Sequence, residues 1–177
     1  MAKIAVIGGG AAGMLAAGRA AQRGHEVHLF EKNNRLGKKI LITGKGRCNV
    51  TNDGDLDAFL DNIPGNPYFM YSAFYRFDNQ ALRQLLLDVG LETKVERGNR
   101  VFPVTDRSLD VVQALEKYMR QNKVALHLES QVEHVVMKEG KVTGICLKNQ
   151  KELPFDAVIV TTGGLSYPNT GSTGDGY

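Results

Sequence analysis

The chain has 177 residues, 42% of them hydrophobic, which is enough for the core of one ordinary domain, or of one domain with a small appendage. Its formal net charge of +3 comes from interspersed acids and bases, so it lacks the basic stripe of nucleic-acid-binding proteins and we expect no nucleic-acid partner. No run approaches transmembrane length, and the widely separated Cys48 and Cys146 exclude a disulfide framework, so we expect no membrane partner and a reducing, cytoplasmic location.

The first predicted element is a strand at Ile4–Ile7, a short apolar run of the kind buried on both faces of a parallel sheet. It leads into the spacing Gly-x-Gly-x-x-Gly, made by Gly8, Gly10 and Gly13. Gly8 lets the chain reverse, and Gly10 leaves room for a pyrophosphate close to the backbone. Gly13, together with Ala17, lets the following helix lie close to the strands. The phosphates are expected at the start of this helix, where unpaired N–H groups and the helix dipole favour an anion.

That helix is predicted over Ala11–Gln22, ending before Gly24, with a second strand over Val27–Phe30. Glu31 closes this strand, and its carboxylate suits the 2′ and 3′ hydroxyls of an adenosine ribose while repelling a 2′-phosphate. The glycine motif alone is weak evidence, but here two strands, a helix and an acid complete one unit of the right length. The unit predicts a dinucleotide site, and the alternative is an ordinary Gly-rich unit that binds no nucleotide.

Residues 32–52 predict a long ordered loop, whereas a nicotinamide-binding fold would continue with another helix and strand. Gly44 and Gly46 permit positive φ and a close approach of backbone amides to a flat or anionic ligand. Three basic side chains could neutralise phosphate, namely Arg35, Lys38 and Lys39. The alternative is that these basic residues are solvated and that Cys48 is a small buried apolar group.

Three helices are then expected, over Asp55–Asn62, Tyr68–Phe77 and Gln80–Val89. The second carries six aromatic side chains, but aromatics at helical spacing more often pack a core or a domain interface than a flavin, so no cofactor contact is assigned to them. A hairpin follows, with strands at Glu92–Glu96 and Arg100–Val104, and Pro103 is expected to place the second strand on a sheet edge.

Ser108 is expected to cap a helix that runs to about Asn122. This helix leads the chain back to the sheet, where Val124–Leu128 is predicted as the third parallel strand. An antiparallel pair follows, and then a last strand, at Gln131–Met137, Lys141–Leu147 and Phe155–Val160. The crossover after the third strand is thus a β-meander, the variant found in FAD-binding folds of the glutathione-reductase type. This favours FAD over a nicotinamide cofactor.

The fold class predicted from these elements is α/β: a glutathione-reductase-type, FAD-binding Rossmann-like fold whose parallel sheet has a β-meander crossover and a small helical and hairpin insertion. Residues 1–52 and 108–177 are expected to form the FAD-binding domain, incomplete at its C-terminus, and residues 53–107 the insertion.

With these pieces in place, the sequence resembles a family of bacterial flavoproteins, the NAD(P)/FAD-dependent oxidoreductases of the aminoacetone-oxidase type. The likeness spans all 177 residues and rests on GGGAAGMLAA with LFEK, GKKILITGKGRCNVTN, RVFPVTDRS and TTGGLSYPNTGSTGDGY. The resemblance implies that FAD is bound by Gly8, Gly9, Gly10, Ala11, Ala12, Gly13, Glu31, Lys32, Arg35, Lys38, Thr43, Gly44, Gly46, Arg47, Cys48, Asn49, Val132, Thr162, Gly163 and Gly164.

Within this set the resemblance implies separate roles. Gly8–Gly13 and Glu31 would hold the ADP half of FAD, and Val132 would meet the adenine through its backbone. Lys38 and the loop 43–49 would lie along the pyrophosphate and flavin, and residues 162–164 would pass close to the dinucleotide.

The resemblance also implies an enzyme that passes electrons through the flavin between a small-molecule substrate and NAD(P)H or another acceptor. Amines, keto compounds and steroid-like enones all remain open as substrates. No catalytic residue is assigned, because no Ser/His/Asp arrangement, metal-ligand cluster or carboxylate pair stands out. Four histidines are expected to be structural or exposed, namely His25, His28, His127 and His134. The alternative is a non-catalytic protein or sensor that binds FAD or NAD.

The Gly-rich stretch at the end of the sequence stops at Tyr177 with no predicted element after it. Since family members are longer, we expect the chain to be the N-terminal part of such a protein, with low FAD affinity and negligible turnover. The oligomeric state is left open.

Overall fold

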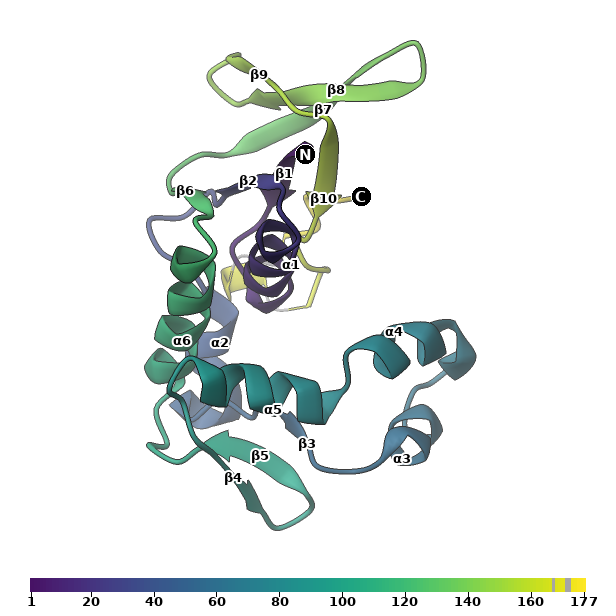
Figure 1. The fold of residues 1–177 in the computed structure, drawn as a ribbon, viewed down its shortest axis with the longest axis vertical. Helices are drawn as coiled ribbons and strands as arrows, with labels where there is room; N and C mark the ends of the chain where they lie inside the picture. The colour runs from purple at the N-terminus through teal and green to yellow at the C-terminus, as the bar shows by residue number, and fades with distance from the viewer. Residues whose placement is uncertain (167, 171–172) are drawn as a thin grey trace. The chain divides into compact units, whose positions relative to one another are not determined.

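A parallel sheet of four strands, in the order β10-β1-β2-β6, carries the N-terminal glycine motif (Figure 1). Its strands are Lys3–Ile7 (β1), Glu26–Phe30 (β2), Ala125–His127 (β6) and Ala157–Val160 (β10). β1 is central and pairs with β2 on one side and with β10 on the other. The carboxyl ends of these strands therefore meet at one edge of the sheet, which is where ligands bind in open parallel sheets.

The computed structural model describes residues 1–166, 168–170 and 173–177, and the chain forms two compact units. The first unit contains Met1–Ile40 and Leu115–Tyr177, and the second contains Leu41–Ala114. The boundaries between these units differ from the expected ones, which lay between residues 52 and 53 and between residues 107 and 108. The difference arises because residues 41–52 form hydrogen bonds with the predicted insertion: the amide of Val50, for example, donates to the carbonyl of Val101 at 2.8 Å. How the function divides between the units stays a prediction.

In the first unit, the helix α1 (Ala11–Gln22) packs against β1, β2 and β10, as the glycine motif predicts. A three-stranded antiparallel meander also packs on this sheet, formed by Val132–Lys138 (β7), Lys141–Leu147 (β8) and Glu152–Pro154 (β9) (Figure 1). The core between sheet and meander contains four buried residues, Ala5, Phe30, Ile145 and Phe155.

The last predicted strand, Phe155–Val160, is confirmed in its C-terminal part as β10, and the short strand β9, which was not predicted, precedes it. β9 pairs with β8 in the meander, and β10 begins at Ala157 and pairs with β1. Phe155, between them, is 4% exposed and belongs to the core. The predicted strand therefore began two residues too early, because the apolar pattern included this buried aromatic residue.

The second unit contains a small antiparallel sheet in the order β3-β5-β4, formed by Thr51–Asn52 (β3), Thr93–Glu96 (β4) and Arg100–Pro103 (β5). The hairpin is confirmed, but the prediction that Pro103 places its strand on an edge is wrong, because β5 is the central strand. β3 is only two residues long and pairs with Arg100 and Val101, so it does not reach Pro103. The missing N–H of the proline therefore costs no ladder bond with β3.

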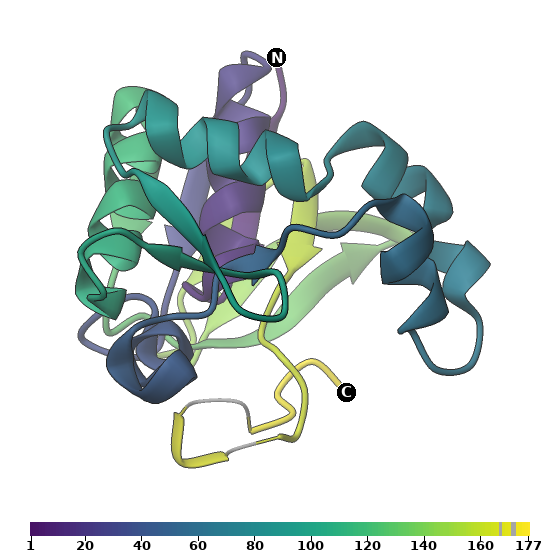
Figure 2. The same cartoon turned by 90° about the horizontal axis from the view of Figure 1, so that it is seen from below.

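Short helices precede this hairpin, at Leu56–Asp61 (α3), Pro67–Met70 (η2), Tyr71–Arg76 (α4) and Asn79–Asp88 (α5), and α5 runs beside it (Figure 2). Tyr68, Phe69 and Tyr75 are 76%, 81% and 79% exposed in the part of the chain that the structure describes. The expectation that these aromatic residues pack a core is therefore wrong. Their place at an interface stays a prediction.

Three further elements complete the chain: Lys38–Ile42 (α2), Thr43–Gly46 (η1) and Ser108–Gln121 (α6), with a short turn at Pro168–Thr170 (η3). The expectation of a loop throughout residues 32–52 is therefore wrong, because α2, η1 and β3 all lie within it. Ser108 begins α6, and its hydroxyl donates to the carbonyl of Leu41 at 2.9 Å. Within the described residues, no helix has both the length and the apolar character that a bilayer crossing requires.

Candidate dinucleotide site

The turn between β1 and α1 is shaped by glycines that a side chain could not replace. Gly8 has a φ of 105°, and a Cβ on it would lie 2.7 Å from the carbonyl oxygen of Thr161. A Cβ on Gly13 would lie 1.8 Å from the carbonyl oxygen of Gly8. Both distances are far below van der Waals contact, so these two glycines allow the turn to pack closely against α1 and β10.

Gly10 differs from its neighbours, because no atom of the residues that the structure describes lies within 4 Å of the position its Cβ would occupy. Its φ of −82° and ψ of −171° are extended values that any residue adopts. Neither backbone conformation nor packing within the chain therefore requires glycine here. The open space at this position is what a bound pyrophosphate needs.

The start of α1 offers hydrogen-bond donors beside this space. Gly10 is the N-cap, and the amide of Met14 donates to its carbonyl at 3.0 Å. The amides of Ala11, Ala12 and Gly13 have no partner among the residues that the structure describes. Because these donors lie at the positive end of a 12-residue helix, they favour an anion without any basic side chain.

Glu31 is buried, with 8% of its surface exposed, and its carboxylate organises the end of β2. Oε2 accepts from the amide of Gly9 at 2.7 Å. Oε1 accepts from the amide of Asn33 at 2.8 Å and also from its side-chain amide. Since each carboxylate oxygen can accept two hydrogen bonds, Oε2 keeps one acceptor position that suits a ribose hydroxyl.

Two residues that sequence reasoning missed hold this loop. The side chain of Leu36 lies 2.2 Å from the Cβ position of Gly9, so a larger residue at position 9 would require Leu36 to move. The hydroxyl of Thr161 donates to the carbonyls of Ile7 and Gly8, at 2.8 and 3.1 Å. Thr161 directly precedes the predicted residues 162–164, but its contacts join positions 153 and 154 residues apart, which spacing alone does not reveal.

The predicted basic residues of the first unit have three different surroundings. Lys32 donates to Thr173 at 2.7 Å and pairs with Asp175 at 2.6 Å, and the hydrogen bond from Lys32 is the main reason why the pKa of Asp175 is lowered. Lys38 donates to the side-chain oxygen of Asn33 at 3.0 Å. Arg35 is exposed and has no ion pair among the described residues, so its charge is the most available to a phosphate.

The remaining predicted residues of the first unit lie at the ends of strands. Val132 begins β7, pairs with Leu147 and packs against the core. Residues 162–164 follow β10, with Thr162 and Gly164 partly buried and Gly163 exposed at a φ of 78°. The structure thus places Val132 and residues 162–164 in the same unit as Gly8–Gly13 and Glu31.

The predicted loop 43–49 belongs to the second unit. It has a left-handed backbone at Gly44, Lys45, Gly46 and Cys48, and a Cβ on Gly44 would lie 2.9 Å from the amide of Asn49. Cys48 is 5% exposed, and burial raises the pKa of its thiol. Thr43 and Asn49 flank these residues, Thr43 partly buried and Asn49 exposed.

Arg47 is held inside this second unit by acidic and aromatic partners. Its guanidinium hydrogen-bonds Asp106 at 2.6 and 2.9 Å, pairs with Glu96 and lies 4.2 Å from the centre of the Phe102 ring. Lys94 also pairs with Asp106, at 2.6 Å. The charge of Arg47 is thus balanced within its unit, and a role for it and the rest of the loop in cofactor binding stays a prediction.

The histidines have mostly structural surroundings. Nδ1 of His28 and Nε2 of His127 lie 2.9 Å apart, and both rings stack with Phe30. Burial lowers the pKa of His127, which favours its neutral form. His25 accepts a hydrogen bond from the amide of Ala2 at 3.2 Å, and His134 is exposed.

Comparison with known families matches residues 2–177 to the HI0933-like protein Rossmann domain. The chain belongs to this family. The HI0933-like chain has the FAD-binding Rossmann-like α/β fold, which confirms the fold class and the FAD cofactor predicted from the sequence. The open space at Gly10, the free amides of α1 and the carboxylate of Glu31 fit the ADP half of that cofactor.

Two relatives and one solved structure illustrate what the HI0933-like chain is similar to. It is 34% identical over 179 residues to the 3-dehydro-bile acid delta(4,6)-reductase of Clostridium scindens, covering 100% of this chain and 42% of the relative. It is 33% identical over 174 residues to the ribosomal RNA dihydrouridine synthase of Escherichia coli, covering 97% of this chain and 42% of the relative.

The solved structure is the 3-ketosteroid-delta4-(5alpha)-dehydrogenase of Rhodococcus jostii, with a TM-score of 0.69 at 17% identity, covering 94% of this chain and 46% of that one. At this identity the likeness shows the fold alone. The HI0933-like chain spans less than half the length of these proteins.

Proposed function

We propose that the HI0933-like chain is the FAD-binding part of a flavin-dependent oxidoreductase that transfers electrons from NAD(P)H to a small-molecule acceptor. One observation carries the proposal: the open space at Gly10 lies at the free amides of α1, in a turn whose Gly9 is bound by the carboxylate of Glu31. These groups match the pyrophosphate and the ribose of one adenosine dinucleotide.

Each of these groups has a defined task in this proposal. The amides of Ala11, Ala12 and Gly13 donate to the pyrophosphate, and the free acceptor position on Oε2 of Glu31 takes a ribose hydroxyl. The negative charge of Glu31 repels a 2′-phosphate, so the site selects against NADP. FAD, when bound, supplies the centre that accepts and donates a hydride.

The names of the two relatives narrow the class of substrate. A delta(4,6)-reductase and a dihydrouridine synthase both add hydrogen across a ring carbon–carbon double bond. We extend this class of reaction to the HI0933-like chain: the double bond gains a hydride and a proton and becomes a single bond, and NAD(P)H is oxidised to NAD(P)⁺. The interspersed charges, with a net value of +3, support a small-molecule substrate over an RNA. The two free, buried cysteines support a reducing cytoplasm.

The resemblance to the aminoacetone-oxidase type supports a different substrate, an amine oxidised with electrons passing from the amine to the flavin. The two classes predict opposite directions of electron flow between flavin and substrate: the reductase passes electrons from the flavin to its substrate, and the amine oxidase passes them from its substrate to the flavin. Anaerobic reduction of the flavin by NADPH or NADH supports the reductase, whereas reduction by aminoacetone supports the amine oxidase.

The test begins with the visible spectrum of the purified protein under anaerobic conditions. For the complete oxidoreductase of which this chain is the FAD-binding part, we expect a yellow flavoprotein that dithionite and one of the nicotinamides both bleach, and whose colour returns when a conjugated ring enone is added. The chain by itself should bind added FAD but turn over negligibly. A flavin bleached by dithionite but by no biological donor would contradict the enzyme and leave a dinucleotide-binding protein. A chain that binds no FAD would contradict the whole proposal.

A further inference from the structure

Three metal-ligating side chains come together on the meander of the first unit through an irregularity in its strand pairing. The register of β7 on β8 shifts between Val132 and His134, which is a β-bulge at Glu133. In a regular strand, Glu133 and His134 would point to opposite faces of the sheet. At a bulge, two consecutive residues face one residue of the partner strand, and here that residue is Cys146, the register partner of His134.

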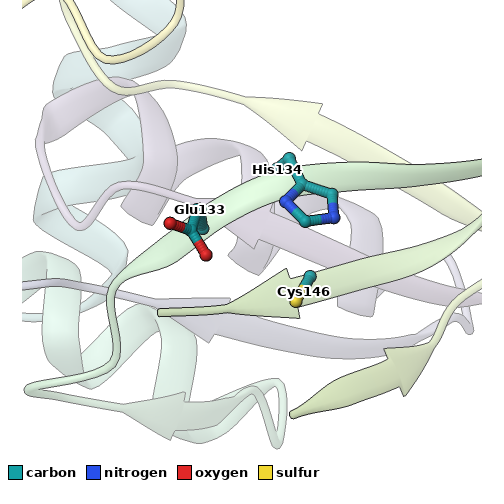
Figure 3. A group of neighbouring side chains, drawn as sticks. All are labelled: Glu133, His134 and Cys146. Carbon is teal, nitrogen blue, oxygen red and sulfur yellow. The ribbon is translucent and has the colours of Figure 1, made fainter. Parts of the chain in front are cut away.

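The three side chains lie next to one another on the neighbouring strands β7 and β8 (Figure 3). A carboxylate oxygen of Glu133, a ring nitrogen of His134 and the sulfur of Cys146 all lie within 4.8 Å of one another. In a tetrahedral zinc site, bonds of about 2.0 to 2.3 Å put neighbouring ligand atoms about 3.3 to 3.8 Å apart. The observed group is therefore at most about 1.5 Å wider than a metal-bound one, a difference that rotation of the side chains of Glu133 and His134 can close.

The group is separate from the core cluster between sheet and meander, and it includes none of the predicted FAD-binding residues. Ile145 and Leu147 pack into the core, so by strand alternation Cys146 belongs to the opposite face of β8. Cys146 is 5% exposed, whereas Glu133 and His134 are exposed. The arrangement is a buried sulfur with two solvent-accessible ligands above it, so a cation can reach it from solvent.

We propose that Glu133, His134 and Cys146 bind one Zn²⁺ ion, with water as the fourth ligand. A thiolate, an imidazole and a carboxylate form a mixed donor set that suits this borderline-soft cation. Mg²⁺ and Ca²⁺ are disfavoured, because they require six or more oxygen ligands and only one carboxylate is present. Binding replaces the thiol proton of Cys146 by the metal, and this proton passes to solvent.

Such an ion would cross-link neighbouring strands of the meander. Glu133 and His134 come from β7 and Cys146 from β8, so the metal would hold the bulge in the one conformation in which both β7 residues face the sulfur. Because the ion binds only this arrangement, it should raise the unfolding temperature of the protein as its concentration rises.

The experiment uses the purified chain, stripped of metal with a chelator and dialysed. Equilibrium dialysis against Zn²⁺ should give one ion per chain. Addition of Co²⁺ should produce a near-ultraviolet thiolate-to-cobalt absorption band, read as a difference spectrum that cancels any flavin, and Zn²⁺ should remove this band. Cys146→Ser should abolish the band, and His134→Ala and Glu133→Gln should each weaken Co²⁺ binding at least about tenfold.

Matched controls identify the ligands. Cys48→Ser removes the other cysteine, and Glu139→Gln alters an exposed carboxylate on the turn after β7, so both should bind as the unaltered chain does. His134 is exposed, so its alanine variant tests the site even if Cys146→Ser fails to fold. Absence of the band from the unaltered chain, its loss in Cys48→Ser, or full affinity in His134→Ala would each overturn the proposal.

Discussion

Replacing Gly10 with valine should remove FAD binding while the chain still folds. In the described part of the chain no atom lies within 4 Å of the Cβ position, and the extended backbone there suits a β-branched residue. An N-cap glycine is preferred over valine, and we expect the free energy of unfolding to fall by no more than about 1 kcal/mol. The new side chain instead fills the space at the free amides of Ala11 and Ala12.

The expected loss of affinity follows from those amides. If two charge-assisted hydrogen bonds to the pyrophosphate are lost, at about 1.5 to 3 kcal/mol each, binding weakens by about 3 to 6 kcal/mol. This corresponds to an increase in the dissociation constant of roughly 10² to 10⁴-fold. Gly10→Ala carries a smaller side chain and should give an intermediate loss.

The assay combines isothermal titration with FAD and thermal unfolding of the ligand-free variants. An unchanged dissociation constant in Gly10→Val, together with an unchanged unfolding temperature, would refute the assignment of this space to the pyrophosphate. Loss of folding in the same variant would instead contradict the open space that the structure shows.

Glu31→Ala should weaken FAD binding, measured by calorimetry, by about 1.5 to 3 kcal/mol. Glu31→Gln should lose less affinity, because its amide oxygen can still accept a hydrogen bond from the backbone. Equal affinity of the unaltered chain and both variants would remove Glu31 from the ribose site. Gly13→Ala should lower the unfolding temperature of the ligand-free chain, because its Cβ would lie 1.8 Å from the Gly8 carbonyl oxygen; a melt like that of the unaltered chain would contradict this packing. Asp106 has its pKa lowered, chiefly by the hydrogen bond from Lys94 and then by that from Arg47, so its contribution to stability should be present above its unfolded pKa and be lost as pH falls through the lower folded value. The difference in unfolding temperature between the unaltered chain and Asp106→Asn should therefore narrow below about pH 4, and a constant difference would exclude this linkage.

The sequence predicted the elements whose signals lie within a few residues. The bounds of α1 and its end before Gly24, which has a φ of 86°, follow from an apolar pattern and a glycine stop. The hairpin of β4 and β5 follows from Gly98 and Asn99, both at positive φ. Each of these signals is local, so no knowledge of the partner segments was needed.

The sequence did not predict elements that exist only through distant partners. β3 is two residues long and is a strand because it pairs with β5, so no local pattern marks it. The guanidinium of Arg47 binds Asp106, 59 positions away, and a lone arginine in a Gly-rich loop gives no sign of that partner. Whether the loop 43–49 contacts the cofactor stays a prediction.

The group at Glu133, His134 and Cys146 shows the same limit in the choice of site residues. Metal-ligand spacing in a sequence is judged on regular elements, where adjacent residues of a strand face opposite sides. By that rule Glu133 and His134 cannot bind one ion, and the sequence indicated no metal cluster. The bulge breaks the rule, because it brings both residues next to Cys146, which is twelve positions after His134. A bulge depends on the pairing of two strands, so the site is defined only once β7 lies against β8. Removing the bulge by deleting one residue of β7 should therefore separate the three ligands, even though all three remain in the sequence.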